Sequence, residues 1–149
     1  MIFKQMTCSQ MLANPLYEGL WHEYRDEAAY TAETAEPDFA HYQALEDTGR
    51  FDITGVFDDD GSLIGFFTLI LSMLPHFKAQ LLASTETLYL SKHSRKGSAG
   101  VRVIKQMQQR AKELGATTLL IGTRSGTRGE RLCEVMGFER QNTVWAVRL

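Results

Sequence analysis

The spacing of apolar residues along the chain changes twice, from a helical period to short runs typical of strands and back to a helical period. After Pro15 and Pro37, apolar residues recur every three or four positions, as on one face of a helix. From residue 51, short apolar runs alternate with turn residues, and the Asp-Gly pair at 60–61 is a strong hairpin signal, so a meander of antiparallel strands is expected. Beyond residue 98 the helical spacing returns, with Gly115 and Gly137 where glycine commonly ends a helix. The pattern predicts helices over residues 15–31, 38–47, 99–114 and 128–136, strands over 51–57, 63–74, 80–90, 117–121 and 143–149, and a further candidate strand at 2–6.

This order of elements predicts an α/β protein with a mixed, mostly antiparallel central sheet flanked by helices on both sides. The strands at 63–74 and 117–121 are apolar enough to be buried, and Leu132, Val135 and Met136 are expected to face inward from the last helix. The length of 149 residues suffices for a core, and no repeat or low-complexity linker divides the chain, so we expect one domain over residues 1–149.

Composition excludes several classes of protein. Hydrophobic residues make up 44% and charged residues 23%, as in ordinary globular domains. The N-terminus lacks a secretory signal, and the longest apolar run, 63–74, is too short to cross a bilayer, so we expect a cytoplasmic protein without a membrane partner. Cys8 and Cys133 form neither a metal-binding spacing nor a disulfide framework, and we expect no metal.

The net charge of −2 conceals a strong asymmetry. Residues 1–90 hold 4 Lys/Arg against 14 Asp/Glu, whereas residues 91–149 hold 12 Lys/Arg against 4 Asp/Glu. One interpretation is simply two solvated faces of opposite sign. The other is a basic half for a polyanionic cofactor and an acidic half for a cationic substrate. Nucleic acid is a poor candidate partner, because the domain as a whole is acidic.

The segment that opens the helix at residue 99 has the character of an anion site. The first N–H groups of a helix lack internal partners, the helix dipole adds positive charge there, and small residues let a phosphate approach the backbone. A tight turn without a ligand is the alternative. The segment consists of Arg95, Lys96, Gly97, Ser98, Ala99 and Gly100.

Together with Leu88-Tyr89-Leu90 before it, and with Leu114-Gly115-Ala116 and Met136-Gly137-Phe138 after it, this segment resembles the GCN5-related N-acetyltransferase (GNAT) family. The resemblance covers residues 50–149, with small acetyltransferase-like proteins of tailed phages as the nearest type. The family's phosphate motif reads Arg/Gln-x-x-Gly-x-Gly/Ala, so Ser98 stands where glycine is usual.

The resemblance implies the acyl-CoA N-acyltransferase fold and direct transfer of an acetyl group from acetyl-CoA to an amine. The strand bearing Leu88, Tyr89 and Leu90 would part from its neighbour, and the pantetheine arm would pair with its free edge. A backbone N–H there, such as that of Leu90, would polarise the thioester carbonyl. Segment 95–100 would bind the pyrophosphate.

An amine must lose a proton before it attacks, so a base is needed. Glu86 lies on the strand where the family often places a carboxylate; a solvated strand charge is the alternative. His76 could lie at the mouth of the cleft or merely in a loop, and Tyr89 could line the acyl pocket or merely pack in the sheet. His93 would assist CoA binding more plausibly than catalysis.

One position departs from the family. Cys133 aligns with a tyrosine that in many members protonates the leaving thiolate, so Tyr89, water or no dedicated acid would serve here. This leaves open a CoA-binding protein with a structural or regulatory role, and an acyltransferase that modifies a nucleobase. The acceptor, a small molecule or a protein amine, cannot be read from the sequence. A final strand carrying Trp145 could also pair two copies into a homodimer.

Overall fold

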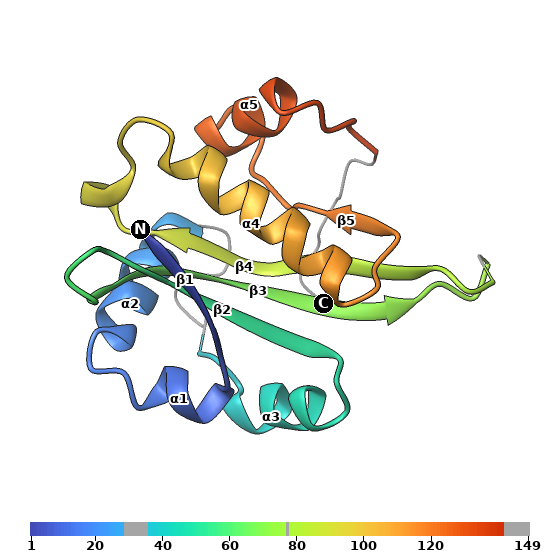
Figure 1. Cartoon of the computed structure of the whole chain (residues 1–149), viewed down its shortest axis with the longest axis horizontal. Helices are drawn as coiled ribbons and strands as arrows, with labels where there is room; N and C mark the ends of the chain where they lie inside the picture. The colour runs from blue at the N-terminus through green and yellow to red at the C-terminus, as the bar shows by residue number, and fades with distance from the viewer. Residues whose placement is uncertain (29–35, 77, 142–149) are drawn as a thin grey trace, which may run out of the picture.

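The computed structural model describes residues 1–28, 36–76 and 78–141. Four strands and three helices precede the basic half of the chain, and two helices and one strand lie within it (Figure 1). In chain order the elements are β1 (Ile2–Met6), α1 (Cys8–Leu12), α2 (Tyr17–Ala28), α3 (Phe39–Asp47), β2 (Phe51–Phe57), β3 (Leu63–Met73), β4 (Leu81–Leu90), the 3-10 turn η2 (Lys92–Ser94), α4 (Ala99–Glu113), β5 (Thr118–Leu120) and α5 (Arg128–Val135).

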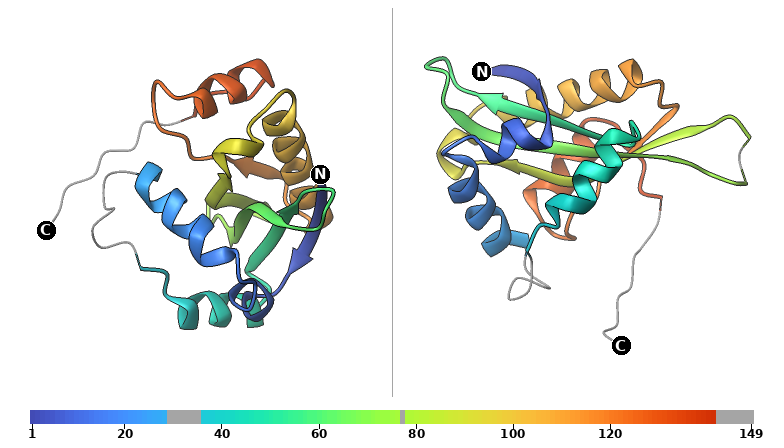
Figure 2. Two further views of the ribbon diagram at one scale, coloured as in Figure 1. Left: turned by 90° about the vertical axis from the view of Figure 1, so that its left-hand side faces the viewer. Right: turned by 90° about the horizontal axis from the view of Figure 1, so that it is seen from below.

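The strands form one sheet in the order β1-β2-β3-β4-β5. The first three pairings are antiparallel, and β4 pairs with β5 in parallel. Helices α1, α2 and α3 cover one face of the sheet, and α4 covers the other (Figure 2). The predicted mixed, mostly antiparallel sheet between helices is therefore confirmed.

Side-chain alternation divides the core between the two faces. Phe51, Ile53 and Phe66 pack under α1–α3, whereas Val56, Phe67 and Leu69 pack under α4. Neighbouring residues of β2 and β3 thus point to opposite layers, which is why strand 63–74 reads as apolar throughout. Most of β3 is buried, and Met73 at its end is exposed.

Several local features differ from the prediction. The first predicted helix begins at Tyr17, and a separate five-residue helix, α1, precedes it. Thr7 and Gln10 cap α1 reciprocally, but five residues are too few to show a helical period. Val135 is 73% exposed rather than turned inward, and β5 is at most half-buried. The predicted strand 143–149, including Trp145, lies outside the described residues.

A buried ion pair fastens α4 to the sheet. Arg110 on α4 donates from Nη2 and Nε to the carboxylate of Asp52 on β2, at 2.5 and 3.0 Å, and only 4% of the Asp52 side chain is exposed. These bonds raise the pKa of the Arg110 guanidinium. Glu113, one turn further along α4, also accepts from Arg110 but is exposed.

Asp52→Asn should therefore lower the free energy of unfolding by about 3 kcal/mol, because it leaves a largely buried guanidinium without its counter-charge. Urea unfolding followed by circular dichroism would measure this change. Glu113→Gln is the matched control and should cost less than about 1 kcal/mol. Equal effects of the two substitutions would contradict the assignment of Asp52 as the main partner.

Candidate active site

Strands β4 and β5 run together for only three residue pairs. Leu82, Ala83 and Ser84 pair with Thr118, Leu119 and Leu120, and the last contact is a hydrogen bond of 2.9 Å from the Gly122 amide to Thr85 Oγ1. Beyond it, Leu88, Tyr89 and Leu90 pair with β3 alone among the residues that the structure describes. Among the described residues this edge of β4 is therefore unpaired beyond Thr85, and we call the space beside it the gap.

The free edge of β4 offers two backbone amides to the gap. Alternate residues of a strand direct their N–H groups to opposite sides. The amides of Thr87 and Ser91 bond to Thr68 and Ile64 on β3. Those of Leu88 and Leu90 therefore point toward the gap, where a polar ligand chain could pair with them.

The gap leads to the start of α4. Gly97 has φ +56°, a conformation that favours glycine, and the following turn brings successive amides to the surface. Among the described residues, five amides here find no hydrogen-bond acceptor, whereas the Ala99 amide bonds to the Lys96 carbonyl. The Ser98 side chain makes no cap hydrogen bond. The five free amides, which we call the amide cradle, belong to Lys96, Gly97, Ser98, Gly100 and Val101.

Helix α5 packs directly on this cradle. A Cβ atom on Gly100 would lie 2.8 Å from Cδ2 of Leu132 on α5. Glycine at this position is thus explained by the close approach of two helices. The predicted small residues at 97–100 form the expected turn.

The Arg95 side chain is turned away from the amide cradle. Its Nη1 and Nη2 atoms donate to the Glu27 carboxylate at 2.8 and 3.0 Å, and its Nε donates to the Leu90 carbonyl at 2.6 Å. The guanidinium also lies over the Tyr89 ring. In this structure Arg95 therefore connects the loop before α4 to α2 and to the end of β4.

Glu27 joins both loops that border the gap. Burial acts to raise its pKa, but hydrogen bonds and charge from Arg95, with Lys92 nearby, bring the pKa below the usual range. Arg124, from the loop after β5, donates to the Glu27 backbone carbonyl at 3.0 Å. The C-terminal turn of α2 is thereby tied to both sides of the gap.

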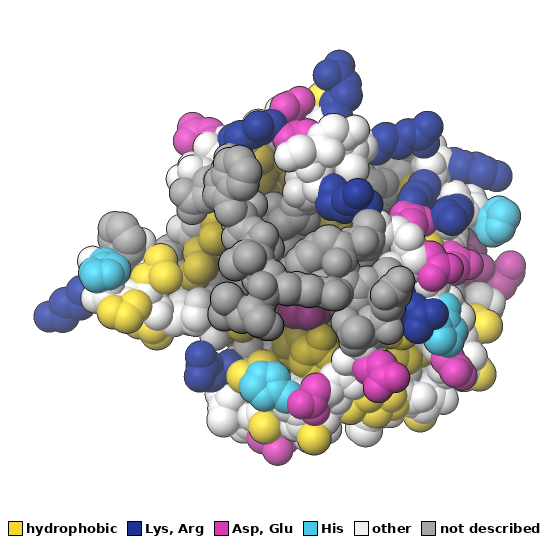
Figure 3. Space-filling model, turned by 180° about the vertical axis from the view of Figure 1, so that it is seen from behind, with side chains coloured by type: hydrophobic (Ala, Val, Ile, Leu, Met, Phe, Trp, Pro, Cys, Tyr) yellow, Lys and Arg dark blue, Asp and Glu magenta, His cyan; other side chains and the backbone are white. Residues whose placement is uncertain are grey.

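The charge asymmetry seen in the sequence is also spatial. Viewed from behind, Lys and Arg side chains gather toward α5 and the loop before α4, and Asp and Glu side chains toward α2 and α3 (Figure 3). A polyanion at the cradle would meet the first group, and a cation approaching the other face of β4 would meet the second.

Glu86 owes its position to an irregularity in β4. The pairing of β3 with β4 shifts register between Phe67 and Leu69, so Thr68 stands opposite both Glu86 and Thr87. In a regular strand these two neighbours would face opposite sides. Here both line the same cavity, on the face that α1–α3 cover. The bulge thus presents a carboxylate beside the free edge of β4.

Three hydroxyl groups hold the Glu86 carboxylate. Tyr42 on α3 donates to Oε1 at 2.9 Å, and Thr87 and Thr68 donate to Oε2 at 2.5 and 3.4 Å. Burial, followed by the charge of Glu86, raises the pKa of Tyr42 far above its usual value, so this hydroxyl remains a donor. Its ring stacks on Phe51 at 4.7 Å between centroids, which fixes its direction.

The cavity beside Glu86 is small and aromatic. Its volume is about 20 Å³, room for about one water molecule. Glu86 itself is exposed, so the carboxylate lies between this cavity and solvent. The other lining residues are Cys8, Met11, Tyr17, Trp21, Phe39, Tyr42, Phe51, Ile53, Phe66, Thr68 and Thr87.

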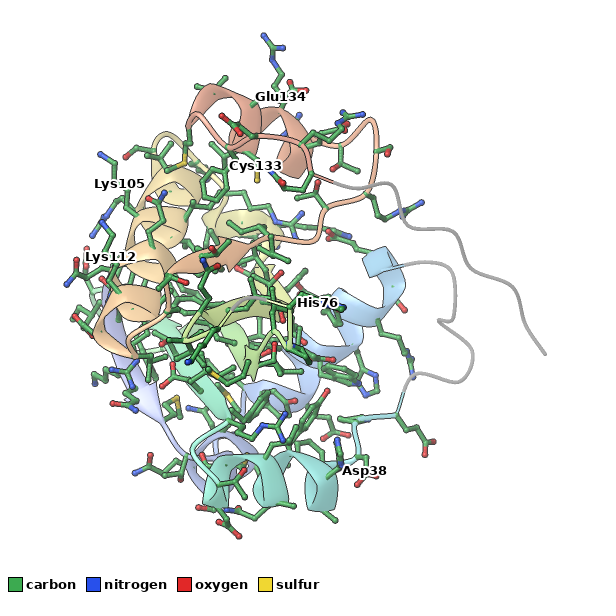
Figure 4. All side chains as sticks on the ribbon, turned by 90° about the vertical axis from the view of Figure 1, so that its right-hand side faces the viewer. Asp38, His76, Lys105, Lys112, Cys133 and Glu134 are labelled. Carbon is green, nitrogen blue, oxygen red and sulfur yellow. The ribbon has the colours of Figure 1, made fainter. Side chains whose placement is uncertain are left out.

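The other predicted catalytic candidates lie elsewhere. His76 is in the turn at the tip of the β3–β4 hairpin (Figure 4), and this hairpin projects beyond the other strands (Figures 1 and 2). Glu86 lies five residues into β4, about 17 Å along the strand from that end, so the structure does not bring the two together. Tyr89 faces α2, where its hydroxyl donates to Glu23 at 2.7 Å. Burial and this carboxylate raise the pKa of Tyr89.

Cys133 is half-buried on α5, and its side chain points toward the sheet (Figure 4). Burial raises the pKa of its thiol, which therefore stays protonated near neutrality. No group of three or more His, Cys, Asp or Glu that could hold a metal ion occurs in the described ranges. Within those ranges no helix is long and apolar enough to cross a membrane.

Sequence reasoning missed the residues that organise the site from a distance. Tyr42 and Thr68 reach Glu86 from other elements, and Glu27 reaches Arg95 across 68 positions. Tyr42 lies within the helix predicted over residues 38–47, where the apolar spacing does not distinguish it from a core residue. Glu27 and Arg95 are far apart in the sequence, and no pattern near either residue indicates that they pair.

No protein-family model and no curated protein matches this sequence. Solved structures do match its fold. A ribosomal-protein-alanine N-acetyltransferase from Brucella melitensis biovar Abortus 2308 superposes with a TM-score of 0.71 at 16% identity, over 100% of both chains. An aminoglycoside acetyltransferase from an uncultured soil metagenomic sample, in complex with sisomicin, gives 0.76 at 13% identity, over 99% of this chain and 95% of the other.

A third match is AAC(6')-Iy in complex with the bisubstrate analogue CoA-S-monomethyl-acetylneamine. Its TM-score is 0.66 at 18% identity, over 99% of this chain and 97% of the other. The chain thus has the fold of the GCN5-related N-acetyltransferases, the family that its motifs resemble. At these identities the likeness establishes the fold, and activity has to be argued from the site.

Proposed function

We propose that this protein is an acetyl-CoA-dependent N-acetyltransferase that moves an acetyl group directly to a primary amine. The observation that carries the proposal is the gap between β4 and β5, which has the amide cradle at its end and a carboxylate beside its free edge. The match to a structure holding a CoA-based bisubstrate analogue adds support.

In this proposal the cradle amides of residues 96–98, 100 and 101 bind the pyrophosphate, with Lys96 contributing charge. The amides of Leu88 and Leu90 pair with the pantetheine arm, and one of them donates to the thioester oxygen as negative charge develops on it. The Leu90 carbonyl is already occupied by Arg95, which fixes the end of the edge.

Glu86 is the proposed base. It accepts one proton from the incoming ammonium, and the neutral nitrogen then attacks the thioester carbonyl carbon. The new C–N bond forms, the C–S bond breaks, and the second proton lost by the nitrogen reaches the departing thiolate. The protonated thiol of Cys133 points toward the sheet and could pass on this proton; water is the alternative donor.

Calorimetric titration with acetyl-CoA tests whether the protein binds the cofactor at all. We expect one site per chain with a dissociation constant in the micromolar range. Mass spectrometry of the denatured protein would detect co-purified CoA. Release of free thiol across a panel of amines would then measure turnover. Absence of binding would overturn the proposal. Binding without turnover on any amine would favour the alternative, a CoA-binding protein with a regulatory or structural role.

A further inference from the structure

A row of aromatic side chains leads from the Glu86 cavity to a second carboxylate. Tyr17 and Trp21 line the cavity, and Trp21 lies 5.2 Å from Tyr24 between ring centroids. Tyr24 in turn lies 6.1 Å from Tyr89. We call these four residues the aromatic row. Three of them project from α2 at positions 17, 21 and 24, which share one face of a helix.

Glu23 stands at the far end of the aromatic row. It is half-buried, and its Oε2 accepts the hydroxyl hydrogen of Tyr89. Among the described residues, no Lys, Arg or His lies within ion-pair distance of either Glu23 or Glu86. Glu27, one turn along α2, is by contrast neutralised by Arg95 and Lys92.

The two carboxylates therefore lie at the ends of a row of aromatic rings, in which Trp21 and Tyr24 are half-buried and Tyr17 and Tyr89 are buried. Glu86 and Tyr89 are three residues apart on β4, about 10 Å along the strand. Aromatic faces attract cations and cover methylene chains. A ligand that fits this arrangement has a positive group at each end and hydrocarbon between them.

We propose, resting on the proposed function, that the acceptor is a linear aliphatic diamine. One amino group gives up its proton to Glu86 and is acetylated. The other stays protonated and binds the carboxylate of Glu23, while the chain between them lies along Trp21 and Tyr24. A monoamine of the same length would lack the second ion pair, and a bulky ring would not follow the row.

The test compares α,ω-diamines of four to eight carbons with the matching n-alkylamines in the thiol-release assay with acetyl-CoA. We expect kcat/KM at least tenfold higher for the best diamine than for its monoamine. Glu23→Gln should abolish this preference by raising KM for the diamine about tenfold, with kcat and the KM for the monoamine kept.

Glu18→Gln is the matched control, because Glu18 is a carboxylate on the same helix that pairs with His22 and is 87% exposed to solvent. It should leave the diamine preference intact. Equal rates for diamines and monoamines, or an unchanged preference in Glu23→Gln, would overturn this inference and leave the N-acetyltransferase proposal standing. Failure of every amine to react would overturn both.

Discussion

Ser98→Asp is expected to bind acetyl-CoA at least about tenfold more weakly than the wild type, without loss of folding. Ser98 occupies the N-cap of α4, and its side chain makes no cap hydrogen bond. An aspartate there would meet unbonded amides and the positive end of the helix dipole, which should raise the free energy of unfolding by about 0.5 kcal/mol. The same negative charge would occupy the site proposed for the pyrophosphate and repel it.

The opposite signs of these two effects make the experiment decisive. Thr7→Asp supplies the control, because Thr7 is the N-cap of α1 on the other side of the sheet and the substitution adds the same charge. Calorimetry should show acetyl-CoA affinity reduced only in Ser98→Asp, and urea unfolding should show both variants folded. Unchanged affinity in Ser98→Asp would mean that the amide cradle binds no phosphate.

Glu86→Gln is expected to reduce kcat by about 10²- to 10³-fold, within the usual range for loss of a general base. The amide keeps the size of the side chain and can still accept from the Tyr42 hydroxyl, but it cannot take a proton from an ammonium group. Acetyl-CoA affinity should stay within about twofold, because the carboxylate lies on the face of β4 that α1–α3 cover, away from the cradle.

Initial-rate assays at saturating acetyl-CoA would measure kcat, and calorimetry would measure the affinity for acetyl-CoA. Glu113→Gln, on the far side of the sheet, controls for a simple change in net charge and should leave kcat unaltered. If kcat of Glu86→Gln equals that of the wild type, Glu86 is not the base, and the three hydroxyl groups that hold it serve the fold alone.

The sequence was sufficient for the sheet and for the turn at the cradle because both depend on local signals. The signals are the spacing of apolar residues, the turn at Asp60-Gly61 and the small residues at 97–100. Each of them determines the structure of residues only a few positions away. The direction of the Arg95 side chain depends instead on Glu27, and no residue near Arg95 in the sequence predicts that partner.

Glu86 was proposed from its place on the strand, where the family often has a carboxylate, and the structure shows that a register shift also determines its direction. Regular alternation places residue 86 on one face and residue 87 on the other, and only the register shift opposite Thr68 brings both to the face that α1–α3 cover. A bulge of one residue leaves no mark in the hydrophobic pattern. His76 failed to reach the site for the converse reason, since a turn residue's distance from β4 depends on how far the hairpin projects.

The contacts of Glu27 have a consequence for motion. Glu27, in the last turn of α2, accepts hydrogen bonds from Arg95 in the loop before α4 and from Arg124 in the loop after β5. The lowered pKa of the Glu27 carboxyl keeps its ion pair with Arg95 charged at neutral pH, whereas the bond from Arg124 to the Glu27 backbone carbonyl does not depend on that charge. Because Glu27 contacts both loops, a change in the distance between these loops would break one of its contacts or move the end of α2.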